Sequence, residues 1–198
     1  MKTILIYGDS NTWGQSSHLG GRYDYETRWV SKLKTLLGTG FDIVPAGLSG
    51  RIAGSYTNVE DIKRGKDAFE VVYRQTFPLD VAIIALGTND LKDKYSISTA
   101  QIADDIEWYK KALEEWTDYA GKRLCSKVLC IAPPNFIEGL LEADEARRTD
   151  LNKQLQARFD NLLVLDEIDM SEDGVHFSEE GHRQMAEAVY KKLKEMGL

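Results

Sequence analysis

The sequence predicts an α/β fold: a three-layer α/β/α sandwich around one parallel sheet. Short apolar runs rich in β-branched residues recur along the chain, and longer amphipathic patterns separate them. Strands that are buried on both faces produce such runs, and the helical patterns between them supply the covering layers. The chain of 198 residues is long enough to bury about 70% of its unfolded surface in one core, so we expect a single domain over residues 1–198.

Five strands are predicted, each from a short apolar run followed by turn-forming or polar residues. In chain order they are Thr3 to Tyr7, Asp42 to Ala46, Asp80 to Leu86, Lys127 to Ala132 and Asn161 to Leu165. Because parallel neighbours are joined by helical crossovers, we expect a flavodoxin-like sheet in the strand order 2-1-3-4-5.

Four helices are predicted, and the clearest one has an apolar stripe with charged residues opposite it. The stripe consists of Ile102, Ile106, Tyr109, Leu113 and Trp116. Their spacing of four, three, four and three residues places them on one helix face, which we expect to pack on the sheet.

A shorter helix is predicted earlier in the chain, from about Glu26 to Leu37. Its apolar residues Trp29, Leu33 and Leu36 are expected to be buried. Gly38 follows at the position where glycine commonly ends a helix, so we expect the helix to stop there.

Two further helices are predicted in the second half of the chain. One spans Glu142 to Phe159, and the other follows Ser178, whose hydroxyl group is a good N-cap. Acidic residues after Ser178 suit the positive end of the helix. The apolar stripe of this last helix consists of Met185, Val189, Leu193 and Met196.

Residues 15–25 and 49–76 show no clear helical or strand pattern. The first segment is rich in Ser, Gly and Tyr, and the second mixes glycines with charged and aromatic residues. Both follow strands at the carboxyl edge of the expected sheet, where α/β proteins bind their ligands. We therefore expect them to be long loops that form pocket walls.

The charge of the chain argues against polyanionic partners. The net charge is -7, the isoelectric point is near 5.1, and no long run of Lys and Arg occurs. Nucleic acids and anionic membrane surfaces bind clustered positive charge, so neither is expected as a partner.

The compartment is predicted from the apolar stretches and the first strand, and the redox state from the spacing of the two cysteines. No apolar stretch approaches the length of about 20 residues that spans a bilayer, and the first predicted strand leaves no room for a signal peptide, so we expect a cytoplasmic protein. Cys125 and Cys130 are five residues apart in one expected strand, which separates their Cα atoms by roughly 16 Å. A disulfide tolerates about 7 Å, so two free thiols are predicted.

Polar side chains that could perform acyl transfer follow the expected strands. Ser10 comes after the first strand, Asn89 and Asp90 come after the third, and Asp173 and His176 lie just before the last helix. A serine hydroxyl needs a base within hydrogen-bond reach and a carboxylate that orients this base. These residues therefore predict a serine hydrolase.

Each of these residues also has an ordinary structural explanation. Alone, Ser10 would cap a helix, Asn89 and Asp90 would form a turn, and His176 would be a surface histidine. Their convergence on one edge of the sheet favours catalysis over these explanations.

The other histidines are weaker candidates. His18 falls in a segment rich in Ser and Gly, and His182 falls within the last helix, where packing or exposure explains it. No two histidines show metal-ligand spacing and neither cysteine belongs to a CxxC motif, so no metal site is predicted.

Four sequence blocks resemble those of the SGNH hydrolases, also called the GDSL esterases and lipases. In chain order the blocks are Gly8 to Asn11, Gly47 to Gly50, Gly87 to Asp90 and Asp173 to His176. Together they cover nearly the whole chain in order and spacing. The resemblance implies an ester-hydrolysing enzyme with the SGNH fold.

The resemblance also assigns roles to individual residues. It implies that Ser10 is the nucleophile, that His176 is the general base and then the general acid, and that Asp173 orients His176. It further implies an oxyanion hole formed by the backbone N–H groups of Ser10 and Gly50 and the side-chain amide of Asn89. No cofactor is required for this chemistry.

One residue in the first block departs from the family pattern. Asn11 stands where the family name has leucine, and because it lies outside the triad we expect no effect on the chemistry.

The segments 8–14 and 86–92 are similar to those of the arylesterase and acyltransferase branch. Members of that branch hydrolyse short acyl esters and often assemble into oligomers, so a small-molecule ester and a homo-oligomer are the expected partners.

The sequence therefore predicts a serine esterase that hydrolyses short-chain acetyl or aryl esters through an acyl-serine intermediate, with acyl transfer as a further activity. One alternative is a carbohydrate O-acetylesterase, which Tyr23, Tyr25 and Tyr56 favour; others are a thioesterase and a lysophospholipase. A flavodoxin-like binding module for a nucleotide or flavin is the non-enzyme alternative. Asp9 would repel phosphate there, and no P-loop lysine follows.

Overall fold

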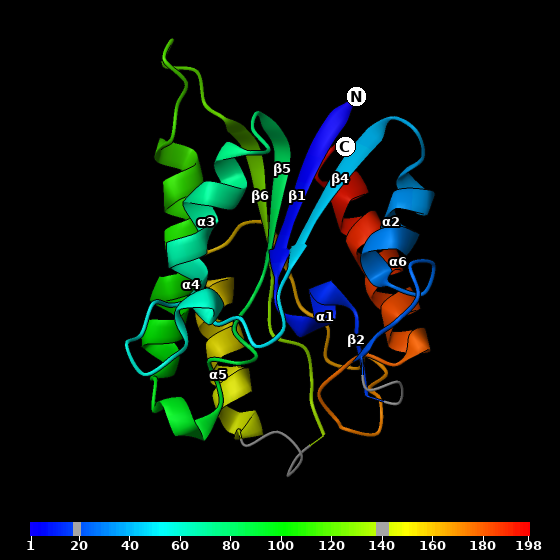
Figure 1. The fold of residues 1–198 in the computed structure, drawn as a ribbon, viewed down its shortest axis with the longest axis vertical. Coiled ribbons are helices and arrows are strands. Elements are labelled where there is room, and N and C mark those ends of the chain that lie inside the picture. The colour runs from blue at the N-terminus through cyan, green and yellow to red at the C-terminus, as the bar shows by residue number, and fades with distance from the viewer. Residues whose placement is uncertain (18–20, 138–142) are drawn as a thin grey trace.

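The middle layer of the protein is a parallel sheet of five strands (Figure 1). The computed structural model describes residues 1–17, 21–137 and 143–198. The sheet consists of β1 (Lys2–Gly8), β4 (Phe41–Gly47), β5 (Leu79–Ala85), β6 (Cys125–Ile131) and β7 (Leu162–Leu163). Its order is β4-β1-β5-β6-β7, which is 2-1-3-4-5 when these five strands are numbered among themselves. The predicted α/β fold class is confirmed.

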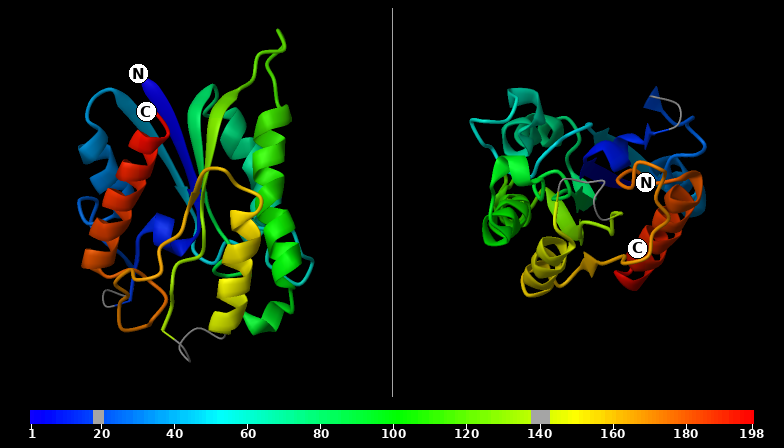
Figure 2. Two further views of the ribbon diagram at one scale, coloured as in Figure 1. Left: turned by 180° about the vertical axis from the view of Figure 1, so that it is seen from behind. Right: turned by 90° about the horizontal axis from the view of Figure 1, so that it is seen from below.

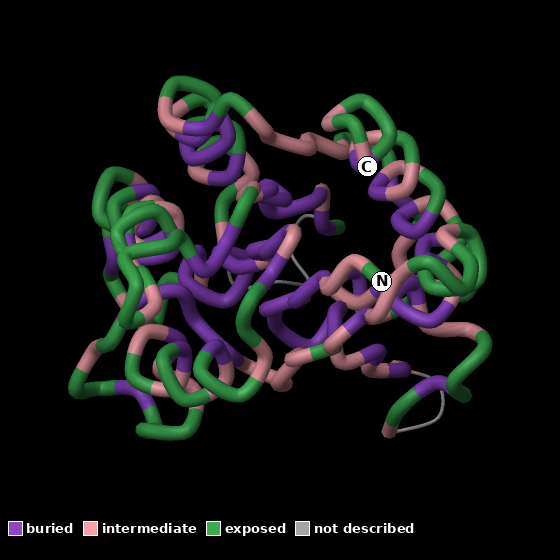
Figure 3. The backbone as a smooth tube through the Cα atoms, turned by 90° about the horizontal axis from the view of Figure 1, so that it is seen from above, coloured by how far each residue is buried: buried purple, intermediate pink, exposed green. Residues whose placement is uncertain are grey.

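Helices cover both faces of the sheet, as Figure 1 and the reverse view in Figure 2 show. On one face lie α2 (Trp29–Leu37) and α6 (Glu179–Glu195). On the other lie α3 (Gly65–Arg74), α4 (Thr99–Glu115) and α5 (Glu145–Gln156). Each layer encloses its own hydrophobic cluster, and buried backbone is concentrated along the strands and the inward sides of the helices (Figure 3).

Several short elements complete the chain. The single-turn helix α1 (Ser10–Trp13) follows β1, and the 3₁₀ turns η1 (Asp61–Lys63) and η2 (Asp93–Tyr95) lie in connections. An antiparallel pair, β2 (Gln15–Ser16) and β3 (Gly21–Arg22), forms a second small sheet that the sequence pattern does not predict. No helix in the described ranges combines the length and the apolar character that crossing a membrane requires.

The predicted helical stripes agree well with the burial. Ile102, Ile106, Tyr109 and Leu113 of α4 are fully buried, and the hydroxyl of Ser98 caps this helix at the Gln101 N–H group. Trp116, the last residue of the predicted stripe, is the C-cap and is partly buried. Helix α6 is likewise capped by its predicted N-cap serine, and Met185, Val189 and Leu193 are buried.

Three predicted elements need correction. The segment 49–76 was expected to be a loop, but it contains η1 and the helix α3, which buries Phe69 and Tyr73 against the sheet. Leu36 was expected to be buried and is 42% exposed, because Trp29 and Leu33 lie on the face of α2 that meets the core. The fifth strand is only Leu162–Leu163, and α5 begins at Glu145; residues 138–142 lie outside the described ranges.

The two cysteines are free thiols, as predicted. Both are buried in the cluster beneath α3, α4 and α5. Burial raises the pKa of the Cys125 thiol to about 11, so this group stays protonated and unreactive at neutral pH.

Candidate active site

The turn that carries Ser10 is the single-turn helix α1, at the carboxyl end of β1 (Figure 1). Asp9 caps this turn, because its Oδ1 accepts a hydrogen bond of 3.0 Å from the Asn11 N–H group. Gly14 ends it with φ = 87°, a left-handed conformation that glycine adopts without strain. Ser10 is therefore presented on a tightly defined turn at the sheet edge where α/β proteins bind ligands.

The structure brings the three predicted triad residues together. Ser10 Oγ lies 3.0 Å from His176 Nε2, and His176 Nδ1 lies 2.6 Å from Asp173 Oδ2. Gly174, with φ = 70°, makes the turn that brings the carboxylate back to the imidazole. The arrangement has the hydroxyl, imidazole and carboxylate in the order that nucleophilic serine catalysis uses.

The Asp173 carboxylate is held in its ionised form. Partial burial favours the neutral acid, but hydrogen bonds from the His176 ring and from the N–H groups of His176 and Val175 outweigh it, and the pKa falls to about 2. A charged carboxylate accepts from Nδ1–H and so leaves Nε2 unprotonated toward Ser10. The imidazole is thereby oriented to receive the serine proton.

The three predicted oxyanion-hole residues lie at the ends of neighbouring strands. The segment after β4 is held against β1, since Leu48 N–H donates to the Gly8 carbonyl at 3.1 Å. Gly50 follows with φ = 77°, which a residue with a Cβ atom would adopt only with strain. The Asn89 amide donates to the Arg51 carbonyl at 3.1 Å, which places its side chain beside the Gly50 turn. This amide has a second N–H for a ligand.

Asp90 is fully buried and holds the same loop that Asn89 contacts, a role that its place in the sequence does not indicate. Its carboxylate accepts from the Ala53 N–H at 2.8 Å and from the Gly54 N–H. Burial raises the pKa of Asp90 to about 7, although these backbone N–H groups oppose the shift. Adjacent residues Asn89 and Asp90 thus bond to two successive parts of one loop.

Arg51 is a second residue whose role its place in the sequence does not indicate. Its buried guanidinium lies 4.0 Å from the centre of the Tyr7 ring and donates to the carbonyls of Gly8, at 2.9 Å, and Ala46. These carbonyls belong to the ends of β1 and β4, so Arg51 links the strand that precedes Ser10 to the strand that precedes Gly50. A lone arginine in a loop gives no sequence signal for such a contact.

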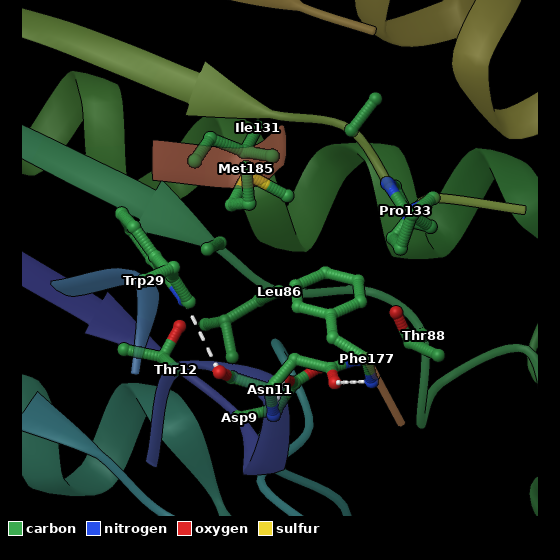
Figure 4. A pocket seen from close by; sticks show the side chains of 13 residues that line it. Asp9, Asn11, Thr12, Trp29, Leu86, Thr88, Ile131, Pro133, Phe177 and Met185 are labelled. Atoms are coloured by element: carbon green, nitrogen blue, oxygen red, sulfur yellow. Dashed lines mark hydrogen bonds between the residues drawn. The ribbon is translucent and has the colours of Figure 1, made fainter. Parts of the chain in front are cut away.

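Two spaces lie near the triad. Beside α1 is a cavity of about 20 Å³ whose walls include Trp29, Leu86 and Phe177 (Figure 4), and none of the three triad residues lines it. Beside Asp173 is an open depression of about 450 Å³, lined by Trp13, Gln15, Ser16, Ser17, Gly21 and Asp173. The depression mixes one aromatic ring with polar side chains, and it adjoins the carboxylate of the triad.

His182, for which packing or exposure was the expected explanation, is fully buried. Its Nδ1 accepts from the Trp29 N–H at 3.2 Å, and its ring meets Tyr23 and Phe177 edge to face. Burial lowers its pKa to about 4, with a smaller contribution from nearby positive charges, so the ring is neutral at pH 7. His18, the other histidine set aside, lies outside the described residues.

The tyrosines that favoured a carbohydrate substrate are differently placed. Tyr23 is 5% exposed and packs on His182, and the Tyr56 hydroxyl donates to the Asp105 carboxylate. Tyr25 is 53% exposed and lies beside depressions lined by residues of α2. The Tyr23 ring is therefore buried in the protein, and the Tyr56 hydroxyl is already bonded to Asp105, so neither supports a sugar-binding role.

Comparison with protein families gives a match to the GDSL-like Lipase/Acylhydrolase family over residues 6–184. This range contains all four sequence blocks and every element from the end of β1 into α6.

Individual relatives agree with the family match. An acetylxylan esterase of Xylanibacter ruminicola is 26% identical over 96% of this chain, and the chain spans 43% of that protein. A carbohydrate acetylesterase from Sinorhizobium meliloti, 25% identical, superposes with a TM-score of 0.87 over 99% of this chain and 100% of the other. The native aryl esterase of M. Smegmatis, also 25% identical, gives 0.87 over 98% and 99%.

Proposed function

The chain belongs to the GDSL-like lipase/acylhydrolase family, and from this premise we propose that it is a serine esterase acting on short-chain carboxylic esters. The observation that carries the proposal is the continuous hydrogen-bonded chain from Ser10 through His176 to Asp173, with contacts of 3.0 and 2.6 Å. Both contacts lie within hydrogen-bond reach, which nucleophile activation requires.

The reaction runs through an acyl-serine intermediate. Ser10 Oγ attacks the ester carbonyl while His176 Nε2 takes its proton, and the resulting imidazolium is stabilised by the Asp173 carboxylate. The alcohol then leaves with the proton from His176. Water, or a second alcohol in the case of acyl transfer, resolves the acyl-enzyme by the same steps in reverse.

The oxygen of the tetrahedral intermediate requires preorganised donors. In our proposal these are the N–H groups of Ser10 and Gly50 and the Asn89 amide. Backbone N–H groups in the first turn of a helix have no partner within that helix, which leaves the Ser10 N–H available. No partner for the Gly50 N–H occurs within residues 1–17, 21–137 and 143–198.

The preference for short acyl groups is supported by the relatives, which are named as acetylxylan, carbohydrate acetyl and aryl esterases. The depression beside Asp173 is open and partly polar, which suits a polar alcohol portion. A cytoplasmic location and a homo-oligomeric state stay predictions.

A covalent probe tests the nucleophile. A fluorophosphonate should label the wild-type protein, and Ser10→Ala should abolish both the label and the hydrolysis of p-nitrophenyl acetate. Ser126→Ala, which removes an exposed serine of β6, should keep both. A wild-type protein that is neither labelled nor active on esters would refute the proposal.

A carbohydrate O-acetylesterase is the second candidate, because relatives named for acetylxylan and carbohydrate acetyl esters match nearly the whole chain. The depression beside Asp173, with Trp13 at its wall, is the place where a sugar would lie. The test compares kcat/KM for acetylated xylose with that for p-nitrophenyl acetate, butyrate and octanoate. A preference for octanoate would contradict both candidates.

A further inference from the structure

The side chain that follows the nucleophile reaches across to the loop that carries the base. Asn11 Oδ1 accepts a hydrogen bond of 2.9 Å from the Phe177 N–H group, as Figure 4 shows. Asn11 Nδ2 donates to the Val175 carbonyl at 3.1 Å. These two loop residues flank His176, so one amide side chain bonds to the backbone on both sides of the histidine.

Asn11 is itself held rigidly. Its main-chain N–H donates to Asp9 Oδ1 at 3.0 Å, and its carbonyl accepts from Trp29 Nε1 at 3.1 Å (Figure 4). The residue is 6% exposed, so these bonds are protected from water. With all four polar groups engaged, Asn11 has little freedom to let the loop move.

One other remote residue holds the loop, because the Ile137 N–H donates to the Gly174 carbonyl at 2.8 Å, but Ile137 follows β6 and is not part of α1. The other hydrogen bonds of the loop that the structure describes are local. Asp173 Oδ1 accepts from the N–H groups of Val175 and His176, and the His176 carbonyl accepts from the Ser171 N–H and hydroxyl. Bonds between residues two to five positions apart define the shape of the loop. They do not determine its distance from α1, whereas Asn11 connects positions 166 residues apart.

We propose that Asn11 is a positioning residue that sets the distance between Ser10 Oγ and His176 Nε2. This inference depends on the proposed function, since it assigns a role in placing the proposed base. Ser10 and Asn11 share one helical turn, so fixing the loop to Asn11 fixes it to the nucleophile. It also differs from the expectation that asparagine in place of leucine at this position has no effect on the chemistry.

The decisive variant is Asn11→Leu, which introduces the residue found in the family name and keeps the branched shape of the side chain while removing its polar atoms. The buried Phe177 N–H and the Val175 carbonyl then lose their partner, and the loop must shift to satisfy them. We expect kcat for p-nitrophenyl acetate to fall at least tenfold while KM changes less than threefold. The rate of fluorophosphonate labelling should fall in parallel with kcat.

A matched control exists in the segment that follows β6. Asn135 also clamps a remote backbone segment, because its Nδ2 donates to the Ile168 carbonyl at 3.1 Å and its Oδ1 accepts from the Ile168 N–H at 2.8 Å. Asn135→Leu therefore removes the same kind of bond pair, but from Ile168 rather than from the two residues that flank His176. We expect a comparable loss of Tm with kcat kept within threefold of wild type.

A spectroscopic signal distinguishes positioning from general destabilisation. The short bond between His176 Nδ1 and Asp173 should give a far-downfield proton resonance, which Asn11→Leu should shift or broaden and Asn135→Leu should preserve. If Asn11→Leu does not fold, Asn11→Asp provides the test. It keeps an acceptor for Phe177 N–H, loses the donor to Val175, and should still lower kcat.

Two results would overturn the inference. One is a folded Asn11→Leu or Asn11→Asp protein with wild-type kcat. The other is an equal loss of kcat in Asn135→Leu, since activity would then follow stability alone. Failure of the proposed function is separate from both, because it appears as a wild-type protein that is inert to esters and to the fluorophosphonate.

Discussion

Replacing Gly47 with alanine should damage the active site through the backbone of α1. A Cβ atom at Gly47, the last residue of β4, would lie 2.3 Å from the Trp13 nitrogen and 2.6 Å from the Thr12 carbonyl carbon. Ordinary contact begins at 3.4 Å, so the turn must move by about 1 Å. These atoms are backbone, and no change of rotamer relieves the clash.

The size of the effect follows from this displacement. Overpacking of this kind costs about 1–3 kcal/mol, and for a chain of this size each kcal/mol lowers Tm by about 2–4 °C. Ser10 belongs to the same four-residue turn, so it moves with Trp13. A misplacement of about 1 Å at a reacting group can cost about 100-fold in rate, and we expect kcat/KM of Gly47→Ala to fall by about that factor.

The assay is hydrolysis of p-nitrophenyl acetate beside thermal unfolding. The control is Gly40→Ala, just before the same strand, where an added Cβ meets nothing within 4 Å. This control should keep wild-type activity and lose no stability. A Gly47→Ala protein with unchanged kcat/KM would show that the close approach of β4 to α1 does not set the position of Ser10.

Three further substitutions test the site and its surroundings. Asn89→Ala removes a proposed oxyanion donor and should lower kcat by about 100-fold, which corresponds to about 3 kcal/mol, with KM nearly unchanged in steady-state assays. Asp173→Asn should lower kcat by about 10⁴-fold at pH 7, where the wild-type carboxylate is ionised, and activity within tenfold of wild type would contradict its role. His182 has its pKa lowered to about 4, so its stabilising contribution is present above pH 6.5 and is lost as pH falls toward 4. In urea titrations the stability difference between wild type and His182→Gln should therefore shrink by about 3 kcal/mol over that range, and a constant difference would refute the assignment.

The strands and the triad residues could be predicted from the sequence because short local patterns specify them. Each sheet strand is an apolar run, and parallel strands bring their carboxyl ends to one edge whatever the length of the connections. Topology therefore brings Ser10 and the connection after the last strand, which carries His176, to the same edge of the sheet. The hydrogen bonds that join them depend on the turn at Gly174, which the Asp-Gly pair already indicates.

The helix α3 was missed because its apolar side is narrow. Only Gly65, Phe69 and Tyr73 are buried in ten residues, and charged side chains occupy much of the rest. Such a helix is stabilised by the aromatic cluster beneath it, where Phe69 meets Tyr7 and Tyr109 edge to face, rather than by its own pattern. Those partners come from distant strands and helices, which no local window contains.

The roles of Asn11, Arg51 and Asp90 were missed for a related reason. Each acts through backbone groups of a segment that approaches only in the folded protein, such as Val175 and Phe177 for Asn11. Backbone partners leave no mark in the sequence, since every residue has a carbonyl and nearly every residue has an N–H group. For these three roles, the only indication in the sequence was Asn11 itself, which stands where the family name has leucine.

The ends of the chain lie at the edge of the sheet opposite α1, as Figure 1 shows. A linker or solid support joined at either end would therefore point away from the Ser10 turn and leave the entrance to the triad facing bulk solvent. Attachment through the exposed residues around Tyr25, by contrast, would put the anchor on the side of α2, nearer to α1. Immobilisation through the termini is thus the geometry that keeps the substrate's approach open.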